Sequence, residues 1–181
     1  MNLTSILLHT CCAPCAVYVV RLLNMGFNVH CFFYNPNIYP KEEYIKRLDT
    51  IKYLSEKDNF ILYTGEYEPE KWNDCIKGFE NEPEGGKRCY LCYKMRLEQT
   101  ALKAIELGIP IFTTTLSVSP HKKAEILNEI GNSIAINHNL QFFNADFKKK
   151  DGYKKSIELS KMYNLYRQNY CGCIFSIRKE F

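Results

Sequence analysis

The sequence predicts an α/β protein in which helices cover both faces of a parallel β-sheet. Short apolar runs alternate with longer segments whose apolar residues recur at helical spacing. Glycine, proline or asparagine separates most of these segments. The 181 residues, 46% of them hydrophobic, can bury a sizeable core as one domain, residues 1–181, and no internal repeat or linker interrupts them. We therefore expect a single Rossmann-like domain.

The predicted elements alternate in order along the chain. The strands are short apolar runs at residues 5–10, 27–34, 60–63, 109–115 and 140–145. The helices are expected at residues 14–25, 40–58, 89–107, 121–130 and 152–164, with a short extra helix that carries Trp72 and Phe79. Pro14 suits the first turn of the first helix, and Gly26 suits its end. Residues 117–120 read as a loop after the fourth strand.

Seven of the nine cysteines form three tight clusters. These are Cys11, Cys12 and Cys15; Cys89 and Cys92; and Cys171 and Cys173. The first cluster follows the first predicted strand, and Cys15 falls in the first turn of the next helix. Ligands of parallel sheets bind at the carboxyl ends of the strands. We therefore expect the fold to bring the clusters together in a site at this edge of the sheet.

The cellular compartment decides whether these cysteines favour disulfides or a metal or catalytic site. The apolar stretch at residues 6–8 is too short for a signal-peptide core, and no run of about 18 apolar residues could span a membrane. We expect a cytoplasmic protein without a membrane partner. In a reducing compartment, an odd count of nine cysteines favours metal binding or catalysis over disulfides. Cys31 and Cys75 stand apart from the clusters, and Cys31 is expected in the core.

Three kinds of site would use such thiols. Cys12 and Cys15 begin a helix after a strand, as in thioredoxin-type dithiol oxidoreductases, although Cys11 is then superfluous. The second and third clusters could instead hold a structural zinc in an RNA-binding module, which would leave the first cluster unexplained. An iron–sulfur cluster takes four thiolates and leaves three for a second metal or a redox pair. No glycine-rich motif for NAD, flavin or a P-loop nucleotide is evident.

The last part of the chain, from about residue 147 to 181, is basic and rich in tyrosine. Its basic residues include Lys148, Lys149, Lys150, Lys154, Lys155, Arg167, Arg178 and Lys179. Its aromatic residues include Tyr153, Tyr163, Tyr166, Tyr170 and Phe175. A charge run is most often a solvated helical face, and the alternative is a surface that contacts phosphates and stacks on bases. The net charge of +4 is compatible with nucleic-acid binding and does not establish it.

Several motifs resemble those of the QueH-type epoxyqueuosine reductases, in order and over nearly the whole chain. They are HTCCAPC at 9–15, FYNPNI at 33–38, KRCYLCYKMRL at 87–97, TTTLSVSP at 113–120 and the closing stretch 147–173. The resemblance implies an oxidoreductase that reduces epoxyqueuosine to queuosine at the wobble position of tRNA, the last step of that modification. It also implies a [4Fe–4S] cluster beside a mononuclear iron, no cobalamin, and an electron donor that the sequence does not identify.

The resemblance further implies a division of the seven cysteines. The [4Fe–4S] ligands would be Cys11, Cys12, Cys89 and Cys92. Cys15, where some relatives have aspartate, would lie at the second iron. Cys171 and Cys173 would be a redox-active pair or further ligands of that iron, so a disulfide and a metal-ligand pair both stay open.

Polar residues near the predicted strand ends and in the basic segment complete the predicted site. The residues expected to contact the nucleotide are Asn35, Asn37, Ser117, Ser119, His121, Lys149, Lys150 and Tyr170. Reduction of an epoxide to an alkene consumes two electrons and two protons and releases the oxygen as water. An open iron site can act as a Lewis acid on that oxygen. His9 and Tyr170 are candidate proton donors, although either could serve only in packing.

Overall fold

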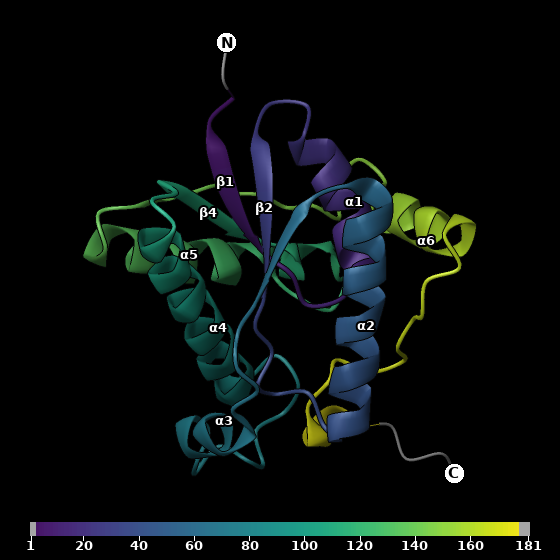
Figure 1. Cartoon of the computed structure of the whole chain (residues 1–181). Helices are drawn as coiled ribbons and strands as arrows, with labels where there is room; N and C mark the ends of the chain where they lie inside the picture. The colour runs from purple at the N-terminus through teal and green to yellow at the C-terminus, as the bar shows by residue number, and fades with distance from the viewer. Residues whose placement is uncertain (1–2, 178–181) are drawn as a thin grey trace.

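A five-stranded parallel sheet with the order β3-β2-β1-β4-β5 forms the centre of the computed structural model, which describes residues 3–177 (Figure 1). The strands are β1 (Ser5–His9), β2 (Asn28–Phe33), β3 (Ile61–Thr64), β4 (Ile111–Thr114) and β5 (Gln141–Phe142). The helices are α1 (Ala13–Leu23), α2 (Lys41–Asp58), α3 (Pro69–Cys75), α4 (Lys87–Glu106), α5 (Ala124–Asn137) and α6 (Gly152–Met162). The predicted α/β class with a parallel sheet is confirmed.

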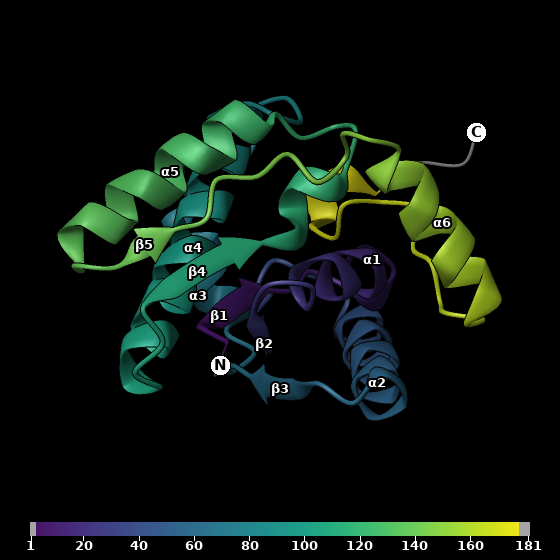
Figure 2. The same cartoon turned by 90° about the horizontal axis from the view of Figure 1, so that it is seen from above.

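Helices cover both faces of this sheet (Figure 2). On one face α1 packs between α2 and α6, over a core that includes Ile6, Leu8 and Val20. On the other face α4 packs against α5, over Leu7, Leu97 and other apolar side chains. Successive side chains of β1 therefore point to opposite cores, which explains why its sequence is a continuous apolar run. No helix within residues 3–177 is long and apolar enough to cross a membrane.

The largest differences from the predicted elements lie around β5. The expected strand 140–145 is only two residues long in the structure. Beyond it the backbone binds side chains of α5 instead of a neighbouring strand: Asn128 accepts a hydrogen bond from the Ala145 amide. The helix α5 runs on to Asn137 instead of ending near residue 130. Gly131 lets α5 continue past Phe142, because any other residue at position 131 would place its Cβ 2.4 Å from the Phe142 ring.

Smaller differences occur at three other positions. The strand β4 begins at Ile111, and Pro110 just before it has no backbone N–H for the ladder. Phe79 lies in the turns beyond α3, which ends at Cys75. The predicted loop after β4 contains a short 3-10 helix, Thr115–Val118.

The strand order places a topological switch point between β1 and β4. These two strands are hydrogen-bonded neighbours, with His9 opposite Thr114, but the chain leaves them toward opposite sides of the sheet. At such a point the loops after the two strands diverge and leave a crevice where ligands bind. The loop after β1 carries the first cysteine cluster, so these thiols lie at the switch point where open α/β sheets bind ligands.

Candidate active site

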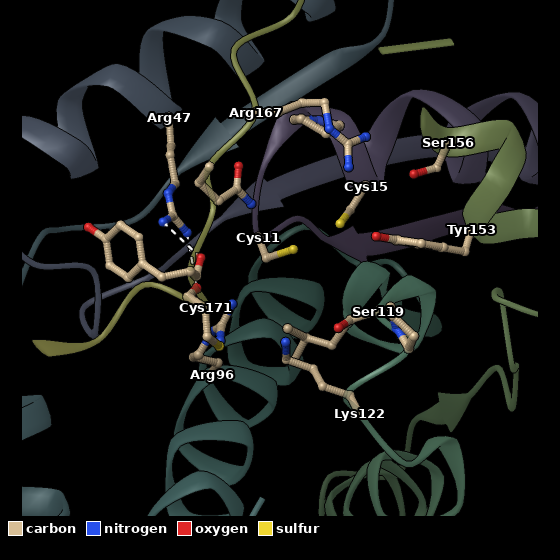
Figure 3. A pocket seen from close by; sticks show the side chains of 15 residues that line it. Cys11, Cys15, Arg47, Arg96, Ser119, Lys122, Tyr153, Ser156, Arg167 and Cys171 are labelled. Carbon is tan, nitrogen blue, oxygen red and sulfur yellow. Dashed lines mark hydrogen bonds between the residues drawn. The ribbon is translucent and has the colours of Figure 1, made fainter. Parts of the chain in front are cut away.

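A cavity of about 140 Å³ opens at the switch point (Figure 3). Segments far apart in the sequence line it: the loop after β1, the turn after β4, the start of α6 and the C-terminal loop. The lining side chains include Cys11, Cys15, Ser119, Lys122, Tyr153, Ser156, Arg167 and Cys171. The cavity therefore combines thiols with cationic, hydroxyl and aromatic groups.

The first cluster forms a compact triad beside this cavity. The sulfur atoms of Cys11, Cys12 and Cys15 all lie within 4.8 Å of one another, a spacing at which they could hold a metal ion. The Thr115 hydroxyl, from the turn after β4, accepts a hydrogen bond from the Cys11 amide at 3.1 Å and donates one to its sulfur at 3.4 Å. The triad is thus tied to β4 as well as to β1.

The three thiols of this triad differ in acidity. Hydrogen bonds from Cys12 and Cys15, the positive charge of Arg96 and the Thr115 hydroxyl hold the pKa of Cys11 well below its usual value. The hydrogen bond to Cys11, together with burial and the charge of Cys11, raises the pKa of Cys12 to about 12. Hydrogen bonds to Cys11 and Cys12, together with burial, raise the pKa of Cys15 well above its usual value. Cys11 is therefore the most acidic thiol of the triad, and Cys12 and Cys15 can donate hydrogen bonds to its sulfur.

The second cluster lies on the first turns of α4. Cys89, Cys92 and Arg96 are spaced by three and four residues, which puts them on one face of this helix. Burial, together with the nearby thiols of Cys171 and Cys173, raises the pKa of Cys89, while burial and Cys171 raise the pKa of Cys92 to about 11. The second and third clusters thus lie close enough to influence each other's charge.

Arg96 is the cation between the cysteine clusters. It is 2% exposed, its Nη1 lies 3.9 Å from the sulfur of Cys92, and its Nη2 donates a 2.6 Å hydrogen bond to Asn35 Oδ1. Burial by itself lowers the pKa of Arg96. The nearby thiols of Cys92, Cys11 and Cys171 outweigh burial and raise this pKa above its ordinary value. No carboxylate within the described residues pairs with it. A buried cation without a carboxylate suits an anionic group held by the thiolates.

A buried ion pair fixes the loop that carries the third cluster. Arg47 of α2 donates to Glu43 at 2.6 Å and to the carbonyl oxygen of Cys171 at 3.0 Å. The Tyr39 amide binds the carbonyl of Gly172 at 2.8 Å. These bonds hold the backbone between Cys171 and Cys173, so both sulfur positions depend on residues more than a hundred positions away in sequence.

Gly172 is required between the two cysteines. Its φ is +138°, and an added Cβ would lie 3.1 Å from Arg47 Nη1 and 3.2 Å from Asn37 Nδ2. We expect Gly172→Ala to displace this loop and to destabilise the protein by about 1–3 kcal/mol. Chemical denaturation checks the stability, and activity on substrate tRNA should fall with it. Gly26→Ala is the control, because nothing lies within 4 Å of a Cβ there; equal behaviour of the two variants would contradict this prediction.

Three of the predicted nucleotide contacts are buried. Asn35 is fully buried, and its amide bonds the carbonyl of Thr10 at 3.0 Å and Arg96. Ser117 accepts a hydrogen bond from the Phe147 amide at 3.3 Å. Asn37 is 3% exposed, and its Oδ1 has no hydrogen-bond partner within the described part of the chain. These positions suit loop stabilisation, and contact with a nucleotide stays a prediction for them.

The other predicted contacts lie at or near the surface. Ser119 and Tyr170 line the cavity. The Tyr170 hydroxyl bonds the carbonyl of Tyr39, and burial raises the pKa of Tyr170. His121 is exposed and does not line the cavity, while Lys149 and Lys150 are exposed in the turn before α6. Of the basic segment 147–181, Arg178 and Lys179 lie outside the described residues.

His9 is fully buried beneath the cavity. Its Nε2 bonds the carbonyl of Tyr34 at 3.1 Å, and its Nδ1 bonds the Thr114 hydroxyl at 2.9 Å. Burial and the charge of Arg96 lower the pKa of His9 to about 3, so the ring is neutral. A neutral ring with both nitrogens engaged links β1, β2 and β4, and this geometry favours a structural role over proton donation.

Sequence reasoning assigned no role to several side chains at the site. Arg96 could have been found, because it follows Cys89 and Cys92 on the same helical face. Gln168, whose Nε2 lies 3.0 Å from the sulfur of Cys12, and Lys122 carry no comparable signal. Their roles depend on contacts between segments that only the fold brings together.

The doubly wound sheet and the thiol triad at its switch point define an α/β protein whose binding site is built on cysteines. The model of the family described as epoxyqueuosine reductase QueH matches residues 6–179. The chain is 38% identical to the epoxyqueuosine reductase QueH of Streptococcus pyogenes and covers 71% of it. It is 40% identical to that of Staphylococcus epidermidis, covering 77%, and 97% of this chain aligns with each. This chain belongs to the QueH family.

Two solved structures share the fold at low sequence identity. A U34-tRNA thiolase, NcsA from Methanococcus maripaludis with its [4Fe–4S] cluster, matches 98% of this chain and 63% of its own, with a TM-score of 0.62 and 12% identity. A predicted subunit of a tRNA methyltransferase from Methanocaldococcus jannaschii matches 86% of this chain and 76% of its own, with a TM-score of 0.58 and 16% identity. At these identities the likeness concerns the fold alone.

Proposed function

We propose that this protein reduces epoxyqueuosine to queuosine at the wobble position of tRNA, as the name of its family describes. The observation that carries the proposal is that the thiol triad and Cys171 meet at one cavity, with the α4 cysteines close to Cys171. The conversion breaks both carbon–oxygen bonds of the epoxide and turns its carbon–carbon bond into a double bond. It consumes two electrons and two protons and releases water.

A [4Fe–4S] cluster fits the donor set of this site. We propose Cys11, Cys12, Cys89 and Cys92 as its ligands, with Cys15 at an adjacent mononuclear iron. All of these cysteines are free thiols in the structure, and the unpaired Arg96 can offset the negative charge of the ligated cluster. Such a group supplies low-potential electrons and a Lewis acid for the epoxide oxygen.

Cys171 and Cys173 are proposed as a redox-active pair or as further ligands of the second iron. Cys171 lines the cavity, whereas Cys173 is 7% exposed and packs against Cys92 and Trp72. One thiol of the pair therefore faces the space for substrate, and the other faces the α4 cysteines. This placement suits a pair that passes electrons or completes a metal site.

The walls of the cavity suit an extruded nucleotide. Tyr153, at the start of α6, can stack on a base, and Ser119 offers a hydroxyl nearby (Figure 3). Arg167 is exposed at the cavity and can contact a phosphate. We also propose a cytoplasmic location, because the reaction needs both tRNA and reduced thiols.

One assay tests the proposed function directly. Anaerobically purified protein is incubated with tRNA that contains epoxyqueuosine and with dithionite as reductant, and the digested nucleosides are analysed. We expect queuosine to form, together with iron and acid-labile sulfide in the purified protein. Colourless protein that holds one zinc and leaves the epoxide intact would point to the zinc-stabilised RNA-binding module. Reduction of disulfide substrates by iron-free protein would point to a dithiol oxidoreductase.

The turn before α6 is the proposed tRNA-contacting part of the basic segment. Lys149 and Lys150 are exposed there, at the same edge of the sheet as the cavity. We expect Lys149→Glu with Lys150→Glu to weaken tRNA binding about tenfold at low salt. The slope of the logarithm of the binding constant against the logarithm of salt concentration should become shallower by about one or two. Fluorescence anisotropy at several salt concentrations measures both quantities.

The matched control is the same charge change on α2. Lys52 and Lys57 are exposed on the C-terminal half of that helix, toward the opposite edge of the sheet. Their double substitution by glutamate should leave tRNA affinity within about twofold, since neither lysine lines the cavity and salt screens exposed charges. Equal losses for the two double variants would remove the turn from the tRNA surface.

A further inference from the structure

Four cationic side chains line the cavity, and they differ in what already binds them. Arg47 binds partners within the protein through all three of its nitrogens. Arg96 is buried and binds Cys92 and Asn35 through its two terminal nitrogens, while its Nε has no hydrogen-bond partner within the described residues. Arg167 is exposed at the cavity. Lys122 is half-buried, and no carboxylate within residues 3–177 forms an ion pair with it. Lys122 is thus a half-buried cation at the cavity whose ammonium is available to a ligand.

The backbone of Lys122 is held in place from two sides. Its amide bonds the carbonyl of Ser119 at 3.2 Å, within the turn after β4. Its carbonyl accepts a 3.3 Å hydrogen bond from Lys148, from the segment before α6. Lys148 forms an ion pair with Asp146, with 2.8 Å between its Nζ and Oδ1. Lys122 has no such partner within the described residues. The side chain of Lys122 projects into the cavity that Cys11 and Cys171 share (Figure 3).

Thiols and a phenol, and no carboxylate of the described residues, lie near the ammonium of Lys122. Although burial lowers the pKa of Lys122, the nearby Cys171, Tyr93, Cys11 and Cys15 raise it above the ordinary value. The side chain is therefore a cation next to the proposed redox centre. Two roles suit such a group: it can offset the charge of the metal site, or it can bind oxygen on the substrate.

We infer that Lys122 binds the epoxide oxygen of the substrate and stabilises the negative charge that forms on this oxygen as the first carbon–oxygen bond breaks. The inference rests on the proposed function. Lys122 supplies no electrons: both come from the external reductant, dithionite in the assay above. The oxygen leaves as water after it takes up two protons, and any proton that Lys122 gives to it is replaced from solvent. A positioned cationic donor in a site shielded from water is an effective way to stabilise a developing oxyanion.

Binding to two tRNAs tests this inference without turnover. In the absence of reductant, the wild-type protein should bind tRNA with epoxyqueuosine about tenfold more tightly than tRNA with queuosine, which lacks the oxygen. Lys122→Met should abolish most of this preference while it leaves the affinity for queuosine tRNA unchanged. Lys123→Met is the control, because the neighbouring Lys123 is exposed and does not line the cavity. A preference that persists in Lys122→Met would overturn the inference.

Single-turnover rates and metal content separate oxygen binding from charge compensation. Lys122→Met should slow reduction about 10²- to 10³-fold with iron, sulfide and visible absorbance at wild-type levels, and Lys122→Arg should recover part of the rate. Loss of iron from Lys122→Met would assign the lysine to the metal site and overturn the inference. Wild-type rates in Lys122→Met would overturn it while the proposed function stands. An inactive wild-type protein with an intact cluster would overturn the proposed function itself.

Discussion

Cys89→Ala is expected to lose the iron–sulfur absorbance and to reduce epoxyqueuosine at least about 10²-fold more slowly than wild type. Removal of a residue that only orients a metal ligand already costs about 10–100-fold, and Cys89 is a proposed ligand. Its thiol lies in the first turn of α4, where the Gly85 amide lies 3.2 Å from the sulfur. Iron and sulfide analysis after anaerobic reconstitution measures the first effect, and single-turnover assays measure the second.

The control for this variant is Cys75→Ala. Cys75 ends α3 and belongs to none of the three clusters, so its loss removes a thiol without touching the site. Its iron content and rate should equal those of wild type, and circular dichroism should show both variants folded. A folded Cys89→Ala protein with its full complement of iron and sulfide would exclude Cys89 as a cluster ligand.

Cys171→Ser is expected to abolish reduction while the [4Fe–4S] absorbance remains. Under the proposed division, Cys171 lies outside the cluster but lines the cavity that is proposed to bind substrate. The loop should keep its path in this variant, because Arg47 binds the carbonyl oxygen of Cys171 and not its side chain. We expect a rate loss of about 10²-fold or more, as for a group that takes part in the reaction.

A second substitution distinguishes the two roles proposed for the Cys171 and Cys173 pair. If the pair is redox-active, Cys173→Ser should lose activity as Cys171→Ser does, and both variants should keep every iron atom. If the pair binds the second iron, each variant should lose that iron alone, and the electron paramagnetic resonance signal of the reduced cluster should persist. Loss of the cluster itself from Cys171→Ser would contradict the division of the cysteines and would place this thiol among its ligands.

The class of fold and the place of the first cluster could be predicted from local sequence. The strand β1 is an uninterrupted apolar run, and α2 and α4 carry apolar residues at helical spacing, so each was recognisable without its neighbours. The shortening of β5 and the length of α5 could not be predicted. Both depend on Gly131 meeting Phe142 and on Asn128 binding the backbone near Ala145. Such contacts override local preference.

The sequence by itself determined that this protein has clustered thiols on an α/β scaffold and which family its motifs resemble. Only the tertiary structure decided how charge is arranged around those thiols. Arg96 lies between the clusters, Arg47 holds the loop of Cys171, and no carboxylate of residues 3–177 pairs with Lys122. The physical reason is the range of the interactions. Periodicity and turn residues act over a few positions, whereas the contact of Arg47 with Cys171 joins residues 124 positions apart. A contact of that separation exists only after the sheet and its helices have packed.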